Sequence, residues 1–177
     1  MPYADTKTID LIIKSREYLE YIEEHILYVK KAWLELQAKC KHEPFVWDDY
    51  LFWSIDNLID KHDMSKLSEE EFVQYRKAFY PVNESERTQC DEAFEHHKEC
   101  NSHHWENWTS KEYYNPYEAT VHCVCMVCDW MAISQKGGTT AQKYYETNKD
   151  KIKLSEWAVE FIYKIFEALQ EVATDAV

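Results

Sequence analysis

Histidine and aspartate occur at positions where helical proteins usually place apolar side chains. His25 lies between Ile22 and Val29 on the apolar face of a predicted helix, and His62 and Asp63 close the next long helix. A buried imidazole or carboxylate is stable only when a partner satisfies it. Imidazole nitrogens and carboxylate oxygens together are typical ligands of Mn, Fe, Co, Ni and Zn. The pattern therefore indicates a His/Asp centre for a divalent transition-metal ion.

Asp129 points to the same chemistry from a different part of the chain. It lies in VHCVCMVCDWMAI, which is apolar on every side of a helix and so predicts a core helix. A carboxylate buried there is costly unless it is paired or coordinated. No Lys or Arg occurs between Lys111 and Lys136, so a local ion-pair partner is missing. A metal ion is the simplest partner for Asp129.

The elements that must position these residues are all helices. Apolar residues recur at spacings of three and four, and the chain has only 2 Gly and 4 Pro, which argues against a β-sandwich or barrel. We predict an all-α fold, a single helical domain over residues 1–177 with six or seven helices. The predicted helices run over about 8–39, 47–61, 68–80, 91–100, 115–137, 140–149 and 155–172. Ser68 with Glu71 predicts a capping box for the third, and Asn115-Pro116 predicts the start of the fifth.

The order of His25, the dipeptide His62-Asp63 and Asp129 resembles the four-ligand signature of the HD-domain superfamily of metal-dependent phosphohydrolases. HDMSK is similar to the HD-x-x-K run of many members. More narrowly, HDMSKLSEEEF, HHKECNSHHWE and CDWMA resemble an uncharacterised family common in phage and bacterial genomes. These motifs occupy about residues 20–135, and we expect the helices over 140–172 to pack on this HD-like core.

The resemblance implies a ligand set. Its first four members are His25, His62, Asp63 and Asp129. In superfamily members with additional histidines, the aspartate of the HD pair bridges two metals. His97 and His104 are the preferred additional ligands here, with His96 and His103 as alternates, because the break near residues 101–102 leaves the register open.

The function implied is hydrolysis of a nucleotide or other small phosphate ester by metal-activated water. Asp63 would act through the metal, and Lys66 would meet the negative charge that grows on the phosphoryl oxygens. Arg76 is the second cation that we expect near a bound phosphate.

Two other functions fit parts of the same pattern. An HD-type di-iron oxygenase would use the same histidines and aspartates. A non-enzymatic binding or inhibitor protein of the phage type would need only a structural metal, and Cys125 and Cys128 form a C-x-x-C that resembles half a zinc site.

Composition restricts partners and location. The formal charge of −13 disfavours broad binding of nucleic acids or anionic membranes, whose phosphates require clustered Lys and Arg. A small phosphorylated substrate in a local pocket remains compatible with that charge. The N-terminal residues do not resemble a signal peptide, and no apolar run is long enough for a membrane span. We expect a cytoplasmic protein whose six cysteines stay reduced.

Overall fold

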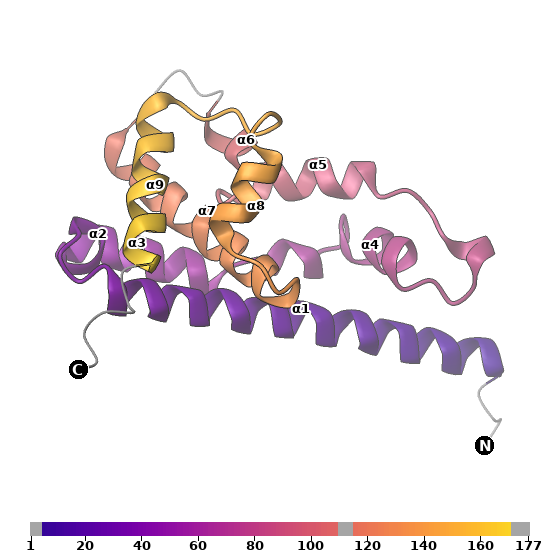
Figure 1. The fold of residues 1–177 in the computed structure, drawn as a ribbon. Helices are drawn as coiled ribbons and strands as arrows, with labels where there is room; N and C mark the ends of the chain where they lie inside the picture. Colours follow the sequence, from indigo (N-terminus) through magenta and orange to yellow (C-terminus); the bar gives the residue numbers. More distant parts are fainter. Residues whose placement is uncertain (1–4, 110–114, 171–177) are drawn as a thin grey trace. The chain divides into compact units, whose positions relative to one another are not determined.

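The computed structural model describes residues 5–109 and 115–170, and these residues form helices and no β-strand (Figure 1). The all-α prediction is therefore confirmed. The seven predicted helices correspond to α1 (Thr6–Lys39), α3 (Asp49–Asp60), α4 (Phe72–Phe79), α5 (Asp91–Cys100), α7 (Pro116–Lys136), α8 (Ala141–Asn148) and α9 (Glu156–Gln170). The structure adds α2 (Pro44–Trp47), α6 (Trp105–Trp108) and two 3₁₀ helices over Met64–Leu67 and Glu84–Glu86. The predicted end of the last helix at residue 172 lies outside the described residues.

The ends of α7 follow from capping residues. The Asn115 side chain accepts a hydrogen bond of 3.0 Å from the Tyr117 N–H, and Pro116 occupies the first turn, where its missing N–H costs nothing. At the other end the helix stops before Gly137, and Gly138 adopts a φ of 64°, which favours glycine. Both ends agree with the sequence prediction.

The predicted capping box at the start of α4 is wrong. The helix begins at Phe72, after a turn through residues 69–71, and no side chain caps it. The Glu71 carboxylate is fully buried and bonds to His96 and His97. The imidazoles of His96 and His97 therefore occupy the carboxylate that the capping box would have directed to the backbone of Ser68.

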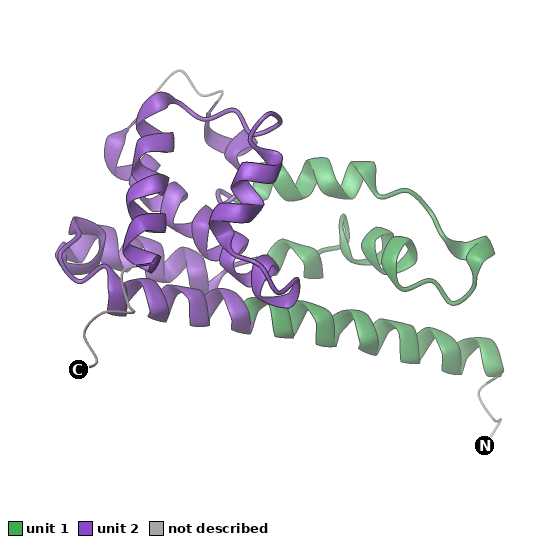
Figure 2. Ribbon diagram, in the orientation of Figure 1, with its two compact units in different colours: residues 1–26, 63–101 green, residues 27–62, 102–177 purple. Residues whose placement is uncertain are grey.

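The chain divides into two compact units, which Figure 2 distinguishes by colour. Unit 1 comprises residues 1–26 and 63–101, and unit 2 comprises residues 27–62 and 102–177. The long helix α1 contributes its first part to unit 1 and its second part to unit 2. The second boundary falls between the consecutive residues His62 and Asp63. The single domain over residues 1–177 stays a prediction.

Helix α7 forms the centre of unit 2. It packs against α3, α6, α8 and α9, so side chains on all its faces are buried, including Val124, Met126 and Val127. This packing explains why the α7 sequence is apolar on every side. Among the described residues, neither α7 nor any other helix is long and apolar enough to cross a membrane.

Unit 1 has a smaller core and an ion pair with a buried guanidinium. Tyr18, Ile22, Tyr75 and Ala93 form the core. Beside it, the Arg76 guanidinium is 3 % exposed and bonds to both carboxylate oxygens of Glu86, at 2.7 and 3.2 Å. Arg76 also donates to the Tyr80 carbonyl, so it ties the end of α4 to the 3₁₀ helix at Glu84–Glu86.

This ion pair predicts acid sensitivity in unit 1. Hydrogen bonds from Arg76 and from the Val82 N–H lower the Glu86 pKa from 4.5 to about 2. A carboxyl group with a lowered pKa stabilises the fold above its unfolded pKa, and that contribution is lost as pH falls from 4.5 towards 2. We expect Glu86→Gln to be less stable than wild type at pH 7 and to match it near pH 2. Urea unfolding followed by circular dichroism at several pH values measures this. Glu84→Gln, at an exposed pair with Arg87, is the control and should change the pH profile less.

Candidate metal centre

Asp63 has an unusual backbone conformation. It follows α3 and opens the 3₁₀ helix over Met64–Leu67 with φ 60° and ψ 11°, in the left-handed region. No other non-glycine residue among those described has a positive φ. Aspartate tolerates this conformation better than most residues, yet it still costs on the order of 1 kcal/mol. Because such strain concentrates at functional sites, the backbone marks Asp63 as a functional candidate independently of its contacts.

The Asp63 carboxylate is 1 % exposed and contacts three nitrogen-bearing side chains of unit 1. His25 Nε2 lies 3.4 Å from Oδ2, and His97 Nε2 lies 3.2 Å from Oδ1. The Lys66 ammonium donates to Oδ2 at 2.5 Å. We call His25, Asp63 and His97 the Asp63 group. Each oxygen of Asp63 therefore faces the Nε2 of a different imidazole.

Glu71 determines which nitrogen of His97 is available. The His97 Nδ1 lies 2.9 Å from Glu71 Oε2, in a buried contact. An ionised carboxylate can only accept, so Nδ1 carries the proton and donates to Glu71. His97 therefore presents Nε2 to Asp63. Histidines that bind metals typically donate their other N–H to a carboxylate in this way.

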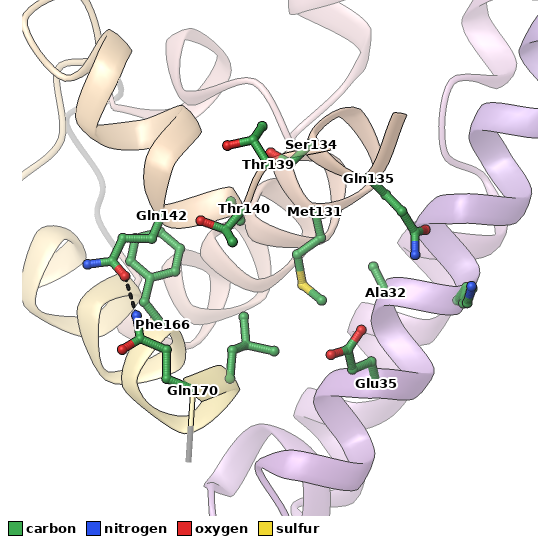
Figure 3. A pocket seen from close by; sticks show the side chains of 13 residues that line it. Ala32, Glu35, Met131, Ser134, Gln135, Thr139, Thr140, Gln142, Phe166 and Gln170 are labelled. Atoms are coloured by element: carbon green, nitrogen blue, oxygen red, sulfur yellow. Dashed lines mark hydrogen bonds between the residues drawn. The ribbon is translucent and has the colours of Figure 1, made fainter. Parts of the chain in front are cut away.

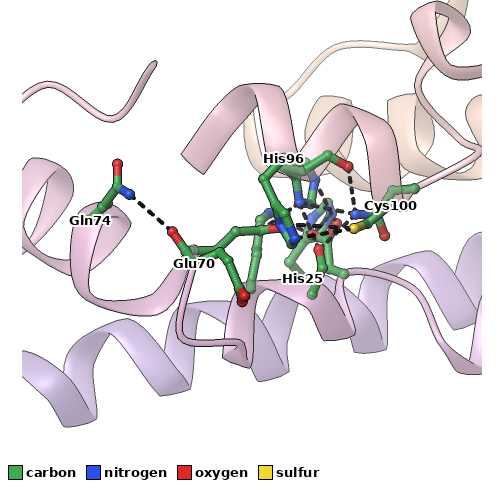
Figure 4. A network of polar contacts seen from close by, with 11 residues as sticks. His25, Glu70, Gln74, His96 and Cys100 are labelled. Atoms are coloured by element: carbon green, nitrogen blue, oxygen red, sulfur yellow. Dashed lines mark hydrogen bonds and ion pairs between the residues drawn. The ribbon is translucent and has the colours of Figure 1, made fainter. Parts of the chain in front are cut away.

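Further polar contacts hold His97 in place. The Asn101 amide donates to the His97 carbonyl at 2.8 Å and to Ser65 Oγ at 2.7 Å, and that hydroxyl lies 3.1 Å from His97 Nδ1. The neighbouring His96 bonds to the other Glu71 oxygen at 2.8 Å. It also lies beside the Cys100 sulfur, as Figure 4 shows. His96 is thus turned to Glu71, whereas His97 contacts both Glu71 and Asp63.

Glu71→Gln is expected to weaken metal binding about 10- to 100-fold, the usual cost of losing an outer-sphere partner of a metal-binding histidine. The amide keeps the size of the side chain and loses the charge that orients His97. Metal affinity is measured by competition with a chelator of known affinity. Glu70→Gln, one residue earlier and exposed, is the control and should bind metal as wild type does. Equal affinity in both variants would contradict the role of Glu71.

A second buried group lies in unit 2. His62, in the turn after α3, places Nε2 3.4 Å from Oδ1 of Asp129 on α7. The His103 ring stacks on the His62 ring, with centroids 4.0 Å apart. One ligand atom from each of these three residues lies within 4.8 Å of the others. We call His62, His103 and Asp129 the Asp129 group. His62 and Asp63 are consecutive, so one peptide bond links this group to the Asp63 group.

The donor chemistry of both groups fits a metal ion. Two ligands about 2.1 Å from one ion at a tetrahedral angle lie about 3.4 Å apart. The His25–Asp63 and His62–Asp129 pairs are both separated by 3.4 Å, longer than the usual length of about 2.9 Å for an N–H···O hydrogen bond. All six members of the two groups are also buried. The structure therefore contains buried His/Asp groups that can hold a metal ion.

The remaining residues singled out from the sequence are His104, Lys66 and Arg76. The His104 ring lies beside His103, with centroids 4.5 Å apart. The Lys66 ammonium contacts Asp63 and lies 6.0 Å from the centroid of the Tyr21 ring. Arg76 bonds to Glu86, and this pairing favours a structural role for its guanidinium over contact with a phosphate.

The sequence interpretation missed three residues that contact or surround the two groups. Glu71 is one of three successive glutamates, and its spacing from Ser68 indicated a helix cap and not a partner of His97. Ser65 lies inside the HDMSK motif, which could have drawn attention to it. Tyr144 lies on α8, and burial together with the negative charges of Asp129 and Glu106 raises the pKa of its phenol. That phenol keeps its proton at neutral pH and can donate a hydrogen bond.

The cysteines of α7 do not resemble a zinc site. Cys123, Cys125 and Cys128 are buried, and burial raises the pKa of all three thiols, that of Cys125 to about 12. Zinc binds thiolates, which these apolar surroundings disfavour. All six cysteines of the chain are free thiols.

Comparison with known proteins assigns a family. The model of a family of unknown function, DUF5662, matches residues 14–172, and the chain therefore belongs to that family. The match includes the C-terminal helices α8 and α9, beyond the motifs described above. Searches of curated proteins and of solved structures found no match.

Proposed function

We propose that this member of the DUF5662 family is a metal-dependent phosphohydrolase acting on a nucleotide or other small phosphate ester. One observation carries the proposal. The buried Asp63 directs its two oxygens at the Nε2 atoms of His25 and His97, with the Lys66 ammonium on the same carboxylate. The proposal also draws on the resemblance of HDMSK and the order of ligands to HD-type phosphohydrolases.

The Asp63 group and the Asp129 group would each hold metal. A bound divalent ion supplies a Lewis acid that lowers the pKa of water towards about 7. The residues of the chain prepare the site for it. Glu71 holds His97 in the tautomer that leaves Nε2 available, and the protonated Tyr144 can donate a hydrogen bond near Asp129.

Lys66 would stabilise charge during the reaction. Its side chain is 15 % exposed, so its ammonium can contact both Asp63 and a molecule arriving from solvent. A phosphoryl group under attack spreads negative charge over its equatorial oxygens, and a positioned ammonium stabilises that charge. Lys66 would then exchange part of its contact with Asp63 for a phosphoryl oxygen.

Elemental analysis followed by an activity panel tests the function. Protein purified without chelator is expected to contain one or two transition-metal ions per chain, and to hydrolyse a nucleotide or phosphodiester when supplied with Mn, Co or Fe. His62→Gln should lose metal and activity, whereas His42→Gln, at an exposed histidine, should keep both. Metal-free protein with unchanged activity would refute the proposal. Oxygen consumption by an iron-loaded sample, without hydrolysis of any ester, would favour the oxygenase.

Lys66→Met is expected to lower kcat about 10²- to 10³-fold while the metal content stays unchanged, because the ammonium is proposed to act on charge that develops in the transition state. Lys61→Met, at an exposed lysine in the same segment, is the control and should keep wild-type kcat. Steady-state kinetics with the best substrate of the panel measure both. If Lys66→Met raised only KM, Lys66 would bind the ground state and not the transition state.

A further inference from the structure

A cavity of about 230 Å³ in unit 2 contains no residue of the Asp63 or Asp129 group (Figure 3). It lies where the C-terminal ends of α7 and α9 meet the N-terminal end of α8 and the second half of α1. Met131 and Ser134 line it from α7, Gln142 from α8 and Phe166 from α9.

Hydrogen bonds around the cavity hold its lining elements in place before any ligand binds. The Gln170 amide donates to the Gln142 side chain across one side of it, as Figure 3 shows. The Lys39 ammonium donates to the Leu169 carbonyl at 2.9 Å and so holds the end of α9 against α1. The Thr139 N–H donates to the Ser134 carbonyl at 3.0 Å, which fixes the turn after α7. Preorganisation of this kind lowers the cost of binding.

The lining combines an apolar surface with neutral polar groups. Met131, Phe166 and Leu169 provide a thioether, a ring and an aliphatic side chain. The polar side chains are three carboxamides and three hydroxyls, each able to donate and to accept: Ser134, Gln135, Thr139, Thr140, Gln142 and Gln170. The two charged lining residues, Lys31 and Glu35, have opposite signs. The cavity thus favours a neutral molecule with an apolar face and an edge of mixed donors and acceptors.

Ser134 offers a buried polar group to a ligand in the cavity. The residue is 2 % exposed, and its Oγ has no hydrogen-bond partner among the described residues. A buried hydroxyl without a partner is costly, so a molecule that bonds to it gains more than it would from a solvated hydroxyl. Ser134 lines the cavity together with Gln135, its neighbour on α7.

We propose that this cavity binds a nucleobase, carried by a nucleoside or a nucleotide. A single purine or pyrimidine is planar and neutral, and is small enough for this volume. Its faces suit the thioether of Met131 and the ring of Phe166, because sulfur and aromatic rings attract one another. Its edge offers the mixture of donors and acceptors that Ser134 and Gln135 require. This site does not depend on the proposed hydrolysis.

Calorimetric titration of the full chain in excess chelator tests this binding apart from any metal chemistry. The probes are adenosine, guanosine, cytidine, uridine and their 5′-monophosphates, with ribose as the negative control. We expect at least one nucleoside to bind with 1:1 stoichiometry and a Kd of about 0.1 mM, the affinity typical of a ligand of this size. Equal affinity for the monophosphate would show that the base alone is recognised, and tighter binding of the monophosphate would show that the bound form is a nucleotide.

Two variants remove single polar groups with little change in shape. Ser134→Ala and Gln135→Leu should each weaken binding about tenfold, the value of one hydrogen bond, while the far-UV spectrum stays unchanged. Gln74→Leu, in unit 1, is the matched control and should bind as wild type does. The proposal is overturned if no nucleoside binds more tightly than about 1 mM, or if both variants bind normally. It is also overturned if hexanoate binds in preference to every nucleoside, since the cavity would then be an anion site.

Discussion

Asp63→Asn is expected to lower kcat/KM for phosphate-ester hydrolysis by about 10³-fold or more, equivalent to a loss of about 4 kcal/mol of transition-state stabilisation. The reason is the use of both carboxylate oxygens, one facing His25 and the other facing His97. An amide has a single oxygen, so its NH₂ group must face one of the two imidazoles. The variant also removes the negative charge that holds Lys66.

The kinetics are measured together with the metal content of the same samples. Asp60→Asn is the control because Asp60 lies three residues earlier, with a 64 % exposed side chain that pairs with Lys30. The control should keep wild-type activity, whereas Asp63→Asn should lose metal along with activity. Activity of Asp63→Asn above about a tenth of wild type would contradict the central role of this carboxylate, because a tenfold loss is only about 1.4 kcal/mol.

Removing metal with a chelator is expected to lower the Tm of the wild type by roughly 8–16 °C. An ion present at about a thousand times its Kd stabilises the folded state by about 4 kcal/mol, and each kcal/mol shifts the Tm of a chain of this size by about 2–4 °C. Thermal unfolding followed by circular dichroism, with and without EDTA, measures the shift. An unchanged Tm would show that neither buried group binds metal in the folded protein.

Asp129→Asn is expected to change the Tm in opposite directions with and without metal. With metal present, the variant should unfold at a lower temperature than the wild type because a ligand is missing. In EDTA it should unfold at the same temperature or a higher one, because a neutral amide costs less to bury beside His62 than a carboxylate does. Asp150→Asn, at an exposed aspartate of unit 2, should follow the wild type in both buffers. If Asp129→Asn were less stable than wild type in both buffers, Asp129 would stabilise the fold through packing and not through a metal ion.

Local patterns were sufficient to predict most helices. The predicted span of α5 agrees with the observed Asp91–Cys100, and the Asn-Pro start and Gly-Gly end of α7 were predicted from capping chemistry. These features depend on residues within one or two turns of each other, so sequence periodicity contains them. The third helix start failed because a distant contact competed for Glu71. His96 and His97 lie 25 and 26 residues away in the chain, and no local pattern reports them.

The sequence by itself determined the residue types of the site, since it placed His25 on an apolar helix face and Asp129 inside an apolar helix. Periodicity reports that such a side chain is buried, but it does not report what lies opposite. Only the tertiary structure decided that His97 and not His96 faces Asp63, that His103 joins His62 and Asp129, and that Arg76 pairs with Glu86. The physical reason is that these partners lie on different elements, ten or more residues apart in the chain, so packing selects which nitrogen or oxygen each group meets.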